Sequence, residues 1–227
     1  MSDAGVRAVW TDFGGVCTEP VAETMKVFSA RVGVAVPALQ AAMLTVAREH
    51  RVTDPLAPLD TPLIGELDWA RAVERVLARD FDLHVRLGDP GEAWFADRPA
   101  NTAWIGFLRR LRASGLFVGM LSNMVPTWER HWRAMVAHQL TFDATVMSYQ
   151  VGFRKPAHQI FTHAAAVAGV PAHACVLIDD LPANCAGAQA AGWSAIHFTD
   201  TGTAVEHLTA LIDKSGVAAA AGDWSTP

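Results

Sequence analysis

Carboxylate, hydroxyl and ammonium groups follow several short apolar runs of this sequence and are candidates for catalysis. The set comprises Asp12, Ser122 with Asn123, Lys155, and Asp179 with Asp180. Carboxylates that share a site repel one another unless a cation is present, and oxygen ligands of this kind suit Mg²⁺. A serine hydroxyl and a lysine ammonium would supply the donor and the positive charge that a phosphoryl group needs. These residue types point to metal-assisted phosphoryl chemistry if the fold brings them together.

The elements that must position these residues are short strands. We predict strands over residues 8–10, 116–121, 145–148, 175–178 and 194–198, with amphipathic helices between them from residue 101 onward. Strands that alternate with helices specify a parallel, doubly wound sheet. Because the carboxyl ends of parallel strands meet at one edge, Asp12, Ser122 and Asp179 are expected to converge there. The predicted fold class is therefore α/β.

Between the first strand and the second lies a long segment with helical periodicity only. It predicts helices over residues 21–32, 37–51, 66–79 and 90–95, and a proline-rich loop over residues 52–62. We interpret residues 19–96 as an inserted, all-helical cap and residues 1–18 with 97–214 as the core. Residues 215–227 have little to bury and are predicted to form a mobile tail.

Composition excludes several classes of protein. The 227 residues carry a net charge of −5 without a block of Lys or Arg, so we expect no nucleic-acid partner. No stretch approaches the roughly 18 apolar residues of a membrane span, and no basic-then-apolar signal opens the chain. The three cysteines show no CxxC spacing. These observations predict a cytoplasmic protein without membrane contact, either a monomer or a homodimer.

Four segments carry a resemblance to a known family: VWTDFGGVCTEP, GMLSN, VGFRKPAHQIF and VLIDDLPANCAGAQAAGW. Together they resemble the motifs of the haloacid dehalogenase (HAD) superfamily, in its phosphatase-like branch with a helical cap of the C1 type after the first strand. The resemblance implies a Rossmann-like core that carries the cap, and a Mg²⁺-dependent hydrolase. It also implies a phosphomonoester substrate, a small phosphorylated metabolite.

The resemblance assigns a role to each motif residue. Asp12 would be the nucleophile that accepts the phosphoryl group as an aspartyl-phosphate, and Lys155 would neutralise charge beside it. Ser122 and Asn123 would hold the phosphoryl oxygens. The metal ligands would be Asp12, Asp180, the backbone carbonyl of Gly14 and, through a bound water, Asp179.

Two further residues are predicted to contact the substrate. Gly15 follows the nucleophile motif, and Glu66 opens a cap helix in a segment that resembles a recurrent cap motif. An acidic residue in the first turn of a helix is also expected simply because it stabilises the helix dipole, so both interpretations of Glu66 stay open.

Gly14 departs from the family pattern, in which a second Asp two residues after the nucleophile acts as general acid and base. Losing such a group typically costs about 10²–10⁴-fold in rate. A good leaving group or a cap residue would compensate, or the enzyme would be slow. Two alternatives stay open: a catalytically weak protein that binds a phosphorylated ligand or regulates a partner, and a metal-free haloacid dehalogenase. The paired acids Asp179 and Asp180 argue against the dehalogenase.

Overall fold

A parallel sheet forms the centre of the computed structural model, which describes residues 5–136 and 138–214. Its five strands are ordered β3-β2-β1-β4-β5 and every neighbouring pair is parallel. The strands are β1 (Ala8–Thr11), β2 (Phe117–Ser122), β3 (Ala144–Met147), β4 (Cys175–Asp179) and β5 (Ser194–His197). The predicted α/β fold with a parallel sheet is confirmed, and β1 occupies its middle.

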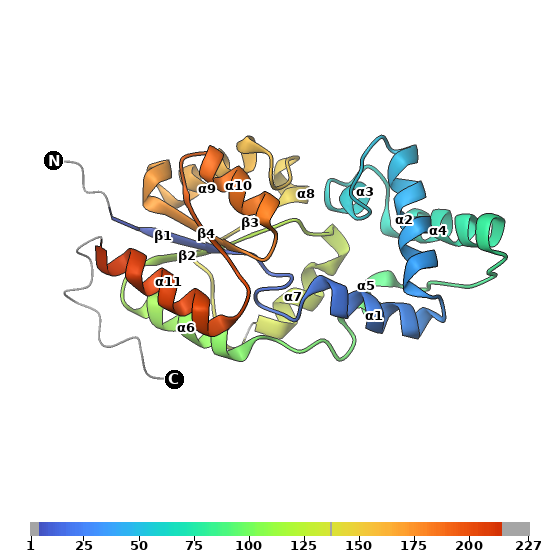
Figure 1. Cartoon of the computed structure of the whole chain (residues 1–227), viewed down its shortest axis with the longest axis horizontal. Helices are drawn as coiled ribbons and strands as arrows, with labels where there is room; N and C mark the ends of the chain where they lie inside the picture. Colours follow the sequence, from blue (N-terminus) through green and yellow to red (C-terminus); the bar gives the residue numbers. More distant parts are fainter. Residues whose placement is uncertain (1–4, 137, 215–227) are drawn as a thin grey trace.

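Helices cover both faces of the sheet (Figure 1). Val9 of β1 faces α6 (Thr102–Ala113) and α11 (Thr201–Lys214), whereas Trp10 faces α9 (His158–Ala168) and α10 (Pro182–Ala190). Both side chains are fully buried. A strand buried on both faces needs apolar residues at every position, which explains the continuous apolar runs in the sequence.

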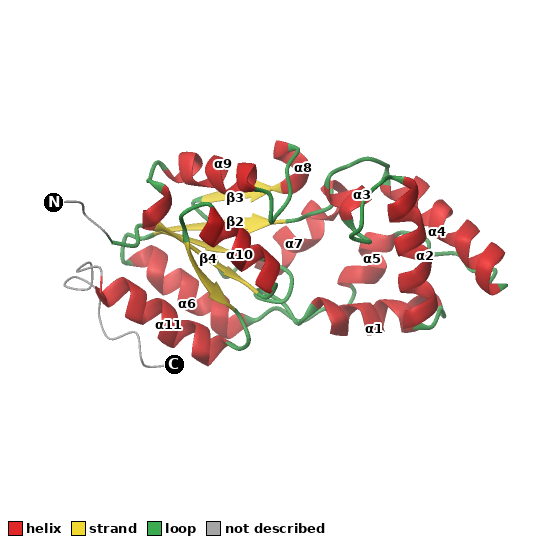
Figure 2. Ribbon diagram, turned by 45° about the horizontal axis from the view of Figure 1, so that its top comes forward, coloured by secondary structure: helices red, strands yellow, loops and turns green. Residues whose placement is uncertain are grey.

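The inserted helices gather beyond the end of the sheet toward which β2 and β3 point (Figure 2). They are α1 (Val21–Val32), α2 (Val36–Glu49), α3 (Ala57–Asp60), α4 (Glu66–Phe81) and α5 (Pro90–Phe95). The two connecting segments run side by side, since Thr18 and Ala100 form an antiparallel bridge. We call residues 19–96 the cap and residues 1–18 with 97–214 the core, with the bounds interpreted from the sequence.

Local structure differs from prediction at a few places. The short helix α3 lies within the segment expected to be a loop; its Pro58 is in the first turn, where proline needs no hydrogen-bonded N–H. One of the helices expected between the strands after residue 101 is a 3₁₀ turn (Pro126–Trp128) followed by α7 (Glu129–Val136). Two further short elements were not predicted, α8 (Ser148–Val151) and a 3₁₀ turn over Ala172–Ala174. The predicted tail lies outside the described residues.

Within residues 5–136 and 138–214, no single helix is both long and apolar enough to cross a membrane. One pair of helices, α1 with α2, passes the same test of length and composition together, but the two are bent by 100° relative to each other.

Candidate active site

Three acidic side chains meet at the carboxyl edge of the sheet. Asp12 follows β1 directly, and its N–H donates to the carbonyl of Ile178 on β4 at 2.9 Å. Asp179 is the last residue of β4, and Asp180 follows it. One carboxylate oxygen from each of these three residues lies within 4.8 Å of the others. The adjacent central strands therefore bring together acids that are far apart in the sequence.

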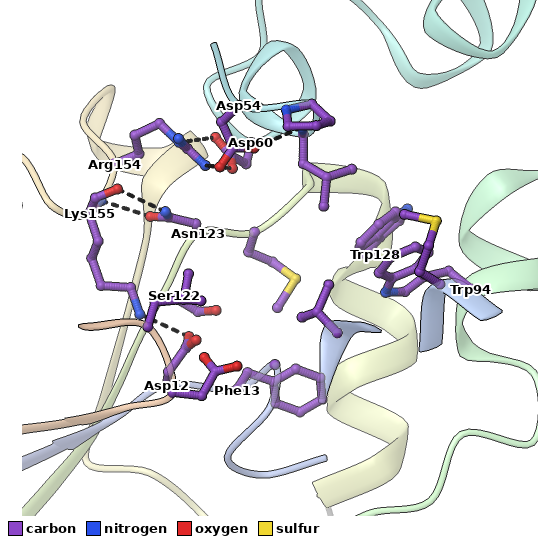
Figure 3. A pocket seen from close by; sticks show the side chains of 18 of the residues that line it. Asp12, Phe13, Asp54, Asp60, Trp94, Ser122, Asn123, Trp128, Arg154 and Lys155 are labelled. Carbon is purple, nitrogen blue, oxygen red and sulfur yellow. Dashed lines mark hydrogen bonds and ion pairs between the residues drawn. The ribbon is translucent and has the colours of Figure 1, made fainter. Parts of the chain in front are cut away.

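Lys155 lies between two of these carboxylates, and Figure 3 shows its side chain reaching Asp12. Its Nζ is 2.5 Å from Asp179 Oδ2 and 3.0 Å from Asp12 Oδ1, and only 1% of its side chain is exposed. Asn123 fixes the lysine backbone, because its Nδ2 donates to the Lys155 carbonyl at 3.0 Å and its Oδ1 accepts from the Lys155 N–H at 2.8 Å. The lysine is thus positioned by the residue that follows β2.

The two neighbouring acids of β4 have different surroundings. Asp179 is fully buried, and its Oδ1 accepts hydrogen bonds from the Leu181 N–H at 3.0 Å and from Asn184 Nδ2 at 2.9 Å. Because Lys155 contacts the other oxygen, Asp179 is held on all sides by the protein. Asp180 is only half-buried and lines the adjoining cavity, so it is the more accessible of the two.

The site holds more negative than positive charge. Burial and the neighbouring carboxylates of Asp12 and Asp179 raise the pKa of Asp180 to about 7. Burial also raises the pKa of Asp12, although Lys155 acts in the opposite direction. Burial alone would lower the pKa of Lys155, but the charges of Asp12 and Asp179 raise it above its usual value. Lys155 is therefore an ammonium that only partly compensates these carboxylates.

The donor set fits Mg²⁺. All three side chains offer hard oxygen ligands, and Asp12 Oδ1 is buried without a hydrogen-bond partner of good geometry among the described residues. A divalent cation would compensate both this oxygen and the excess negative charge. Asp12 and Asp180 are the residues available to hold it, with the backbone of Gly14, which lines the same cavity.

A cavity of about 430 Å³ opens in front of Asp12, between the core and the cap. Most of the predicted site residues line it: Asp12, Gly14, Ser122, Asn123, Lys155 and Asp180. Ser122 lies at the end of β2 with 3% of its surface exposed, and its hydroxyl is within hydrogen-bonding reach of Asp12. Figure 3 shows the side chains of Asp12, Ser122, Asn123 and Lys155 on one side of the cavity, opposite Trp94 and Trp128.

The structure places two predicted substrate contacts elsewhere. Gly15 lies against Asp180; it has a φ of +77°, and a Cβ atom there would be 2.1 Å from Asp180 Oδ2. Gly15 therefore makes room for the carboxylate rather than lining the cavity. Glu66 accepts hydrogen bonds from the hydroxyl of Thr127 and, at 2.5 Å, from Nε1 of Trp128. It joins the cap to the core and fixes the Trp128 ring instead of facing the cavity.

Arg98 is a cavity residue that the sequence did not reveal. Its guanidinium is buried, lies 5.7 Å from the ring centroid of Phe95 and 6.0 Å from that of Trp94, and its Nε has no partner among the described residues. Burial lowers its pKa to about 10, so it stays charged at neutral pH. Arg98 lies in the segment that returns from the cap, where a single arginine has no periodicity or motif to distinguish it.

A second unpredicted feature joins the cap to the core beside the lysine. Arg154 donates from Nε and Nη2 to the two carboxylate oxygens of Asp60 at 2.9 and 2.8 Å (Figure 3). Its Nη2 also lies 3.2 Å from Asp54 Oδ2. A planar, bidentate pair of this kind fixes orientation as well as distance. Since Arg154 precedes Lys155, the pair holds the cap against the segment that carries Lys155.

Comparison with protein-family models identifies the family of this chain. The family model for haloacid dehalogenase-like hydrolases matches residues 6–192. The chain belongs to this family and is a hydrolase. No similar sequence was found among curated proteins.

Solved structures share the fold at low sequence identity. A HAD family enzyme from Bacteroides thetaiotaomicron, in complex with magnesium and inorganic phosphate, is 21% identical with a TM-score of 0.64; the match covers 90% of this chain and 99% of that one. A 2-haloacid dehalogenase from Pseudomonas syringae is 20% identical with a TM-score of 0.60, covering 85% and 86%. An L-2-haloacid dehalogenase from Xanthobacter autotrophicus, with chloropropionic acid covalently bound, is 14% identical with a TM-score of 0.61, covering 94% and 87%.

Proposed function

We propose that this protein is a Mg²⁺-dependent phosphomonoester hydrolase that forms an aspartyl-phosphate on Asp12. The observation that carries the proposal is the cluster of Asp12, Asp179 and Asp180 within 4.8 Å, with Lys155 Nζ 3.0 Å from Asp12. The magnesium and phosphate bound to the Bacteroides enzyme support it. The substrate would be a small phosphorylated metabolite; a cytoplasmic location and a monomeric or homodimeric state stay predictions.

In this proposal each residue acts at a stated atom. A carboxylate oxygen of Asp12 attacks phosphorus, the bond from phosphorus to the ester oxygen breaks, and the alcohol leaves with a proton from solvent. Water then attacks the same phosphorus and regenerates Asp12 with release of inorganic phosphate. Lys155 reduces the repulsion between Asp12 and the phosphate, and the Ser122 hydroxyl donates to a phosphoryl oxygen. A bound Mg²⁺ would add positive charge at the phosphate oxygens.

Arg98 supplies part of what Gly14 lacks. The missing acid–base carboxylate would have stabilised the leaving oxygen by giving it a proton. A buried guanidinium stabilises the same developing charge electrostatically, although it transfers no proton at neutral pH. We therefore assign Arg98 to the leaving-group side of the site.

Haloacid dehalogenation is the second candidate. It is favoured by the buried cation of Arg98 near Asp12, which suits a haloacid carboxylate, and by the dehalogenases among the structural neighbours. In that reaction Asp12 would attack carbon and halide would leave. The acids Asp179 and Asp180 have no evident use without a cation, so we rank this candidate below the phosphatase. A binding or regulatory protein stays the third.

One experiment separates the three candidates. The purified protein is assayed with acetyl phosphate and p-nitrophenyl phosphate, with Mg²⁺ or EDTA, beside the variants Asp12→Asn and Asp82→Asn. Asp82 is 98% exposed in its side chain and serves as the matched control. Phosphate release that needs Mg²⁺ and disappears only in Asp12→Asn supports the phosphatase. Chloride release from 2-chloropropionate in EDTA supports the dehalogenase, and phosphate binding without any turnover supports the binder.

A further inference from the structure

The cavity changes character with distance from Asp12. Beyond the carboxylates its walls are apolar side chains that come mainly from the cap: Val21, Met25, Met43, Leu44, Leu56 and Trp94. A volume of about 430 Å³ leaves room for a substantial organic group in addition to a phosphate. An organic group attached to the phosphate would therefore contact a hydrocarbon surface.

One wall of this region is aromatic and rigid. The rings of Trp94 and Trp128 stack with their centroids 5.4 Å apart and an interplanar angle of 23°, and Phe95 meets Trp128 edge-on at 5.5 Å. The indole N–H of Trp128 is bonded to Glu66, so the polar edge of the ring is already satisfied within the protein. Trp128 thus offers apolar ring surface rather than a hydrogen-bond donor.

Most polar side chains of the same region are paired within the protein. Arg98, whose Nε has no partner among the described residues, lies beside Gly14 at the charged end of the cavity. Arg154 is bonded to Asp60, and Asn123 to the backbone of Lys155. Gln40 lies at an exposed position of the lining. Sugar hydroxyls that enter such a cavity would lose their hydrogen bonds to water and find too few protein partners to replace them. This loss costs binding free energy. An alkyl or aryl group would gain by leaving water.

We propose that the substrate is the phosphate ester of an apolar alcohol, and that the wall between cap and core selects it against sugar phosphates. This inference rests on the proposed phosphatase function. The inference depends on two adjoining regions of one cavity. The charged end, at Asp12 and Lys155, has room for a phosphate, and it continues into an apolar region bounded by Trp94 and Trp128.

A homologous series of esters tests the proposal. Ethyl, butyl and hexyl phosphate are compared with glycerol phosphate and glucose 6-phosphate in the presence of Mg²⁺. We expect kcat/KM to rise about fourfold for each added methylene until the cavity is filled. A flat series, or glucose 6-phosphate as the better substrate, overturns the inference while leaving the phosphatase intact.

A pair of variants locates the effect. Leu44 is half-buried in α2 and lines the cavity, whereas Val27 of α1 is 44% exposed and does not. Leu44→Glu is expected to lower kcat/KM for hexyl phosphate at least tenfold more than it lowers kcat/KM for acetyl phosphate. Val27→Glu should change neither. An equal loss of kcat/KM for hexyl phosphate and acetyl phosphate in Leu44→Glu contradicts a selective apolar wall. An equal loss of kcat/KM in the two variants contradicts it as well.

Binding separates failure of the inference from failure of the proposed function. Hexylphosphonate and methylphosphonate cannot be hydrolysed, and each is added to the protein in a thermal-melting experiment. If no ester is turned over but hexylphosphonate raises Tm more than methylphosphonate does, the phosphatase proposal fails and the apolar ligand class stands. Equal shifts from the two phosphonates reject the apolar ligand class.

Discussion

Nη2 of Arg98 lies 3.9 Å from the position that a Cβ atom would take on Gly14. A side chain at residue 14 would therefore point toward the buried guanidinium of Arg98. The family pattern described above has an acid at this position, whereas here an arginine from the returning segment occupies the same neighbourhood. In the proposed phosphatase reaction, Arg98 would replace proton transfer to the leaving group by electrostatic stabilisation.

The first prediction restores the missing carboxyl group. A Cβ at Gly14 would meet Val21 at 3.4 Å, which is ordinary contact, so Gly14→Asp should fold normally. We expect kcat for phosphomonoesters to rise at least about tenfold, less than the ~10²–10⁴-fold of an ideal acid–base group because the ion pair with Arg98 favours the charged carboxylate. Gly14→Asn has the same shape without the proton. If both variants behave alike, the proton-transfer explanation is rejected.

The second prediction concerns Lys155. Lys155→Met leaves Asp12 and Asp179 buried without their cation, which should cost about 3–5 kcal/mol of unfolding free energy in EDTA. The rate should fall by at least about 10²-fold, since the charge beside the nucleophile is lost. Urea denaturation and steady-state kinetics measure the two effects. Lys155→Arg keeps the charge but not the size. We expect its unfolding free energy to lie closer to that of the unaltered protein than the unfolding free energy of Lys155→Met does. The opposite order of the two variants would contradict the charge argument.

The third prediction is stabilisation by metal. At about 100 times its Kd, Mg²⁺ should add ~2.7 kcal/mol, because it binds only the folded arrangement of carboxylates. For a chain of this size that corresponds to an increase in Tm of about 5–10 °C. Asp180→Asn should abolish the shift, and Asp82→Asn should preserve it. A Tm that is insensitive to Mg²⁺ in the unaltered protein would argue for metal-free chemistry.

The fourth prediction is a pH dependence at the contact between cap and core. Burial raises the pKa of Asp60 to about 6, although Arg154 lowers it. A carboxyl group whose pKa is higher in the folded than in the unfolded protein contributes most to the stability of the fold at a pH below its pKa in the unfolded protein. That contribution is lost as the pH rises through about 6. The stability of the unaltered protein relative to Asp60→Asn should therefore fall by up to about 3 kcal/mol between pH 4 and 7.

Urea denaturation of both proteins in EDTA at several pH values measures this difference. Leaving out the metal avoids its separate pH dependence at Asp12 and Asp180. A relative stability that rises with pH would mean that the attraction of Arg154 outweighs the cost of burying Asp60.

The amino-acid sequence determined the parts of this protein that depend on local pattern. Continuous apolar runs predicted the strands, and the polar residue that ends each run identified Asp12, Ser122 and Asp179, because parallel strands carry their carboxyl ends to one edge. Helical periodicity located the cap. These inferences hold because each needs only a short window of residues and one general rule of sheet topology.

Tertiary structure alone decided which distant segments meet. Arg98 faces the position of Gly14 within the core. Arg154 pairs with Asp60, and Glu66 bonds to Trp128, across the boundary of cap and core. The partner that a charged or polar side chain finds depends on packing between segments far apart in the chain, which periodicity and motif spacing do not encode. The charges of Asp12, Lys155, Asp179 and Asp180 could be predicted from the motifs, whereas the place of Arg98 and the shape and polarity of the cavity required the fold.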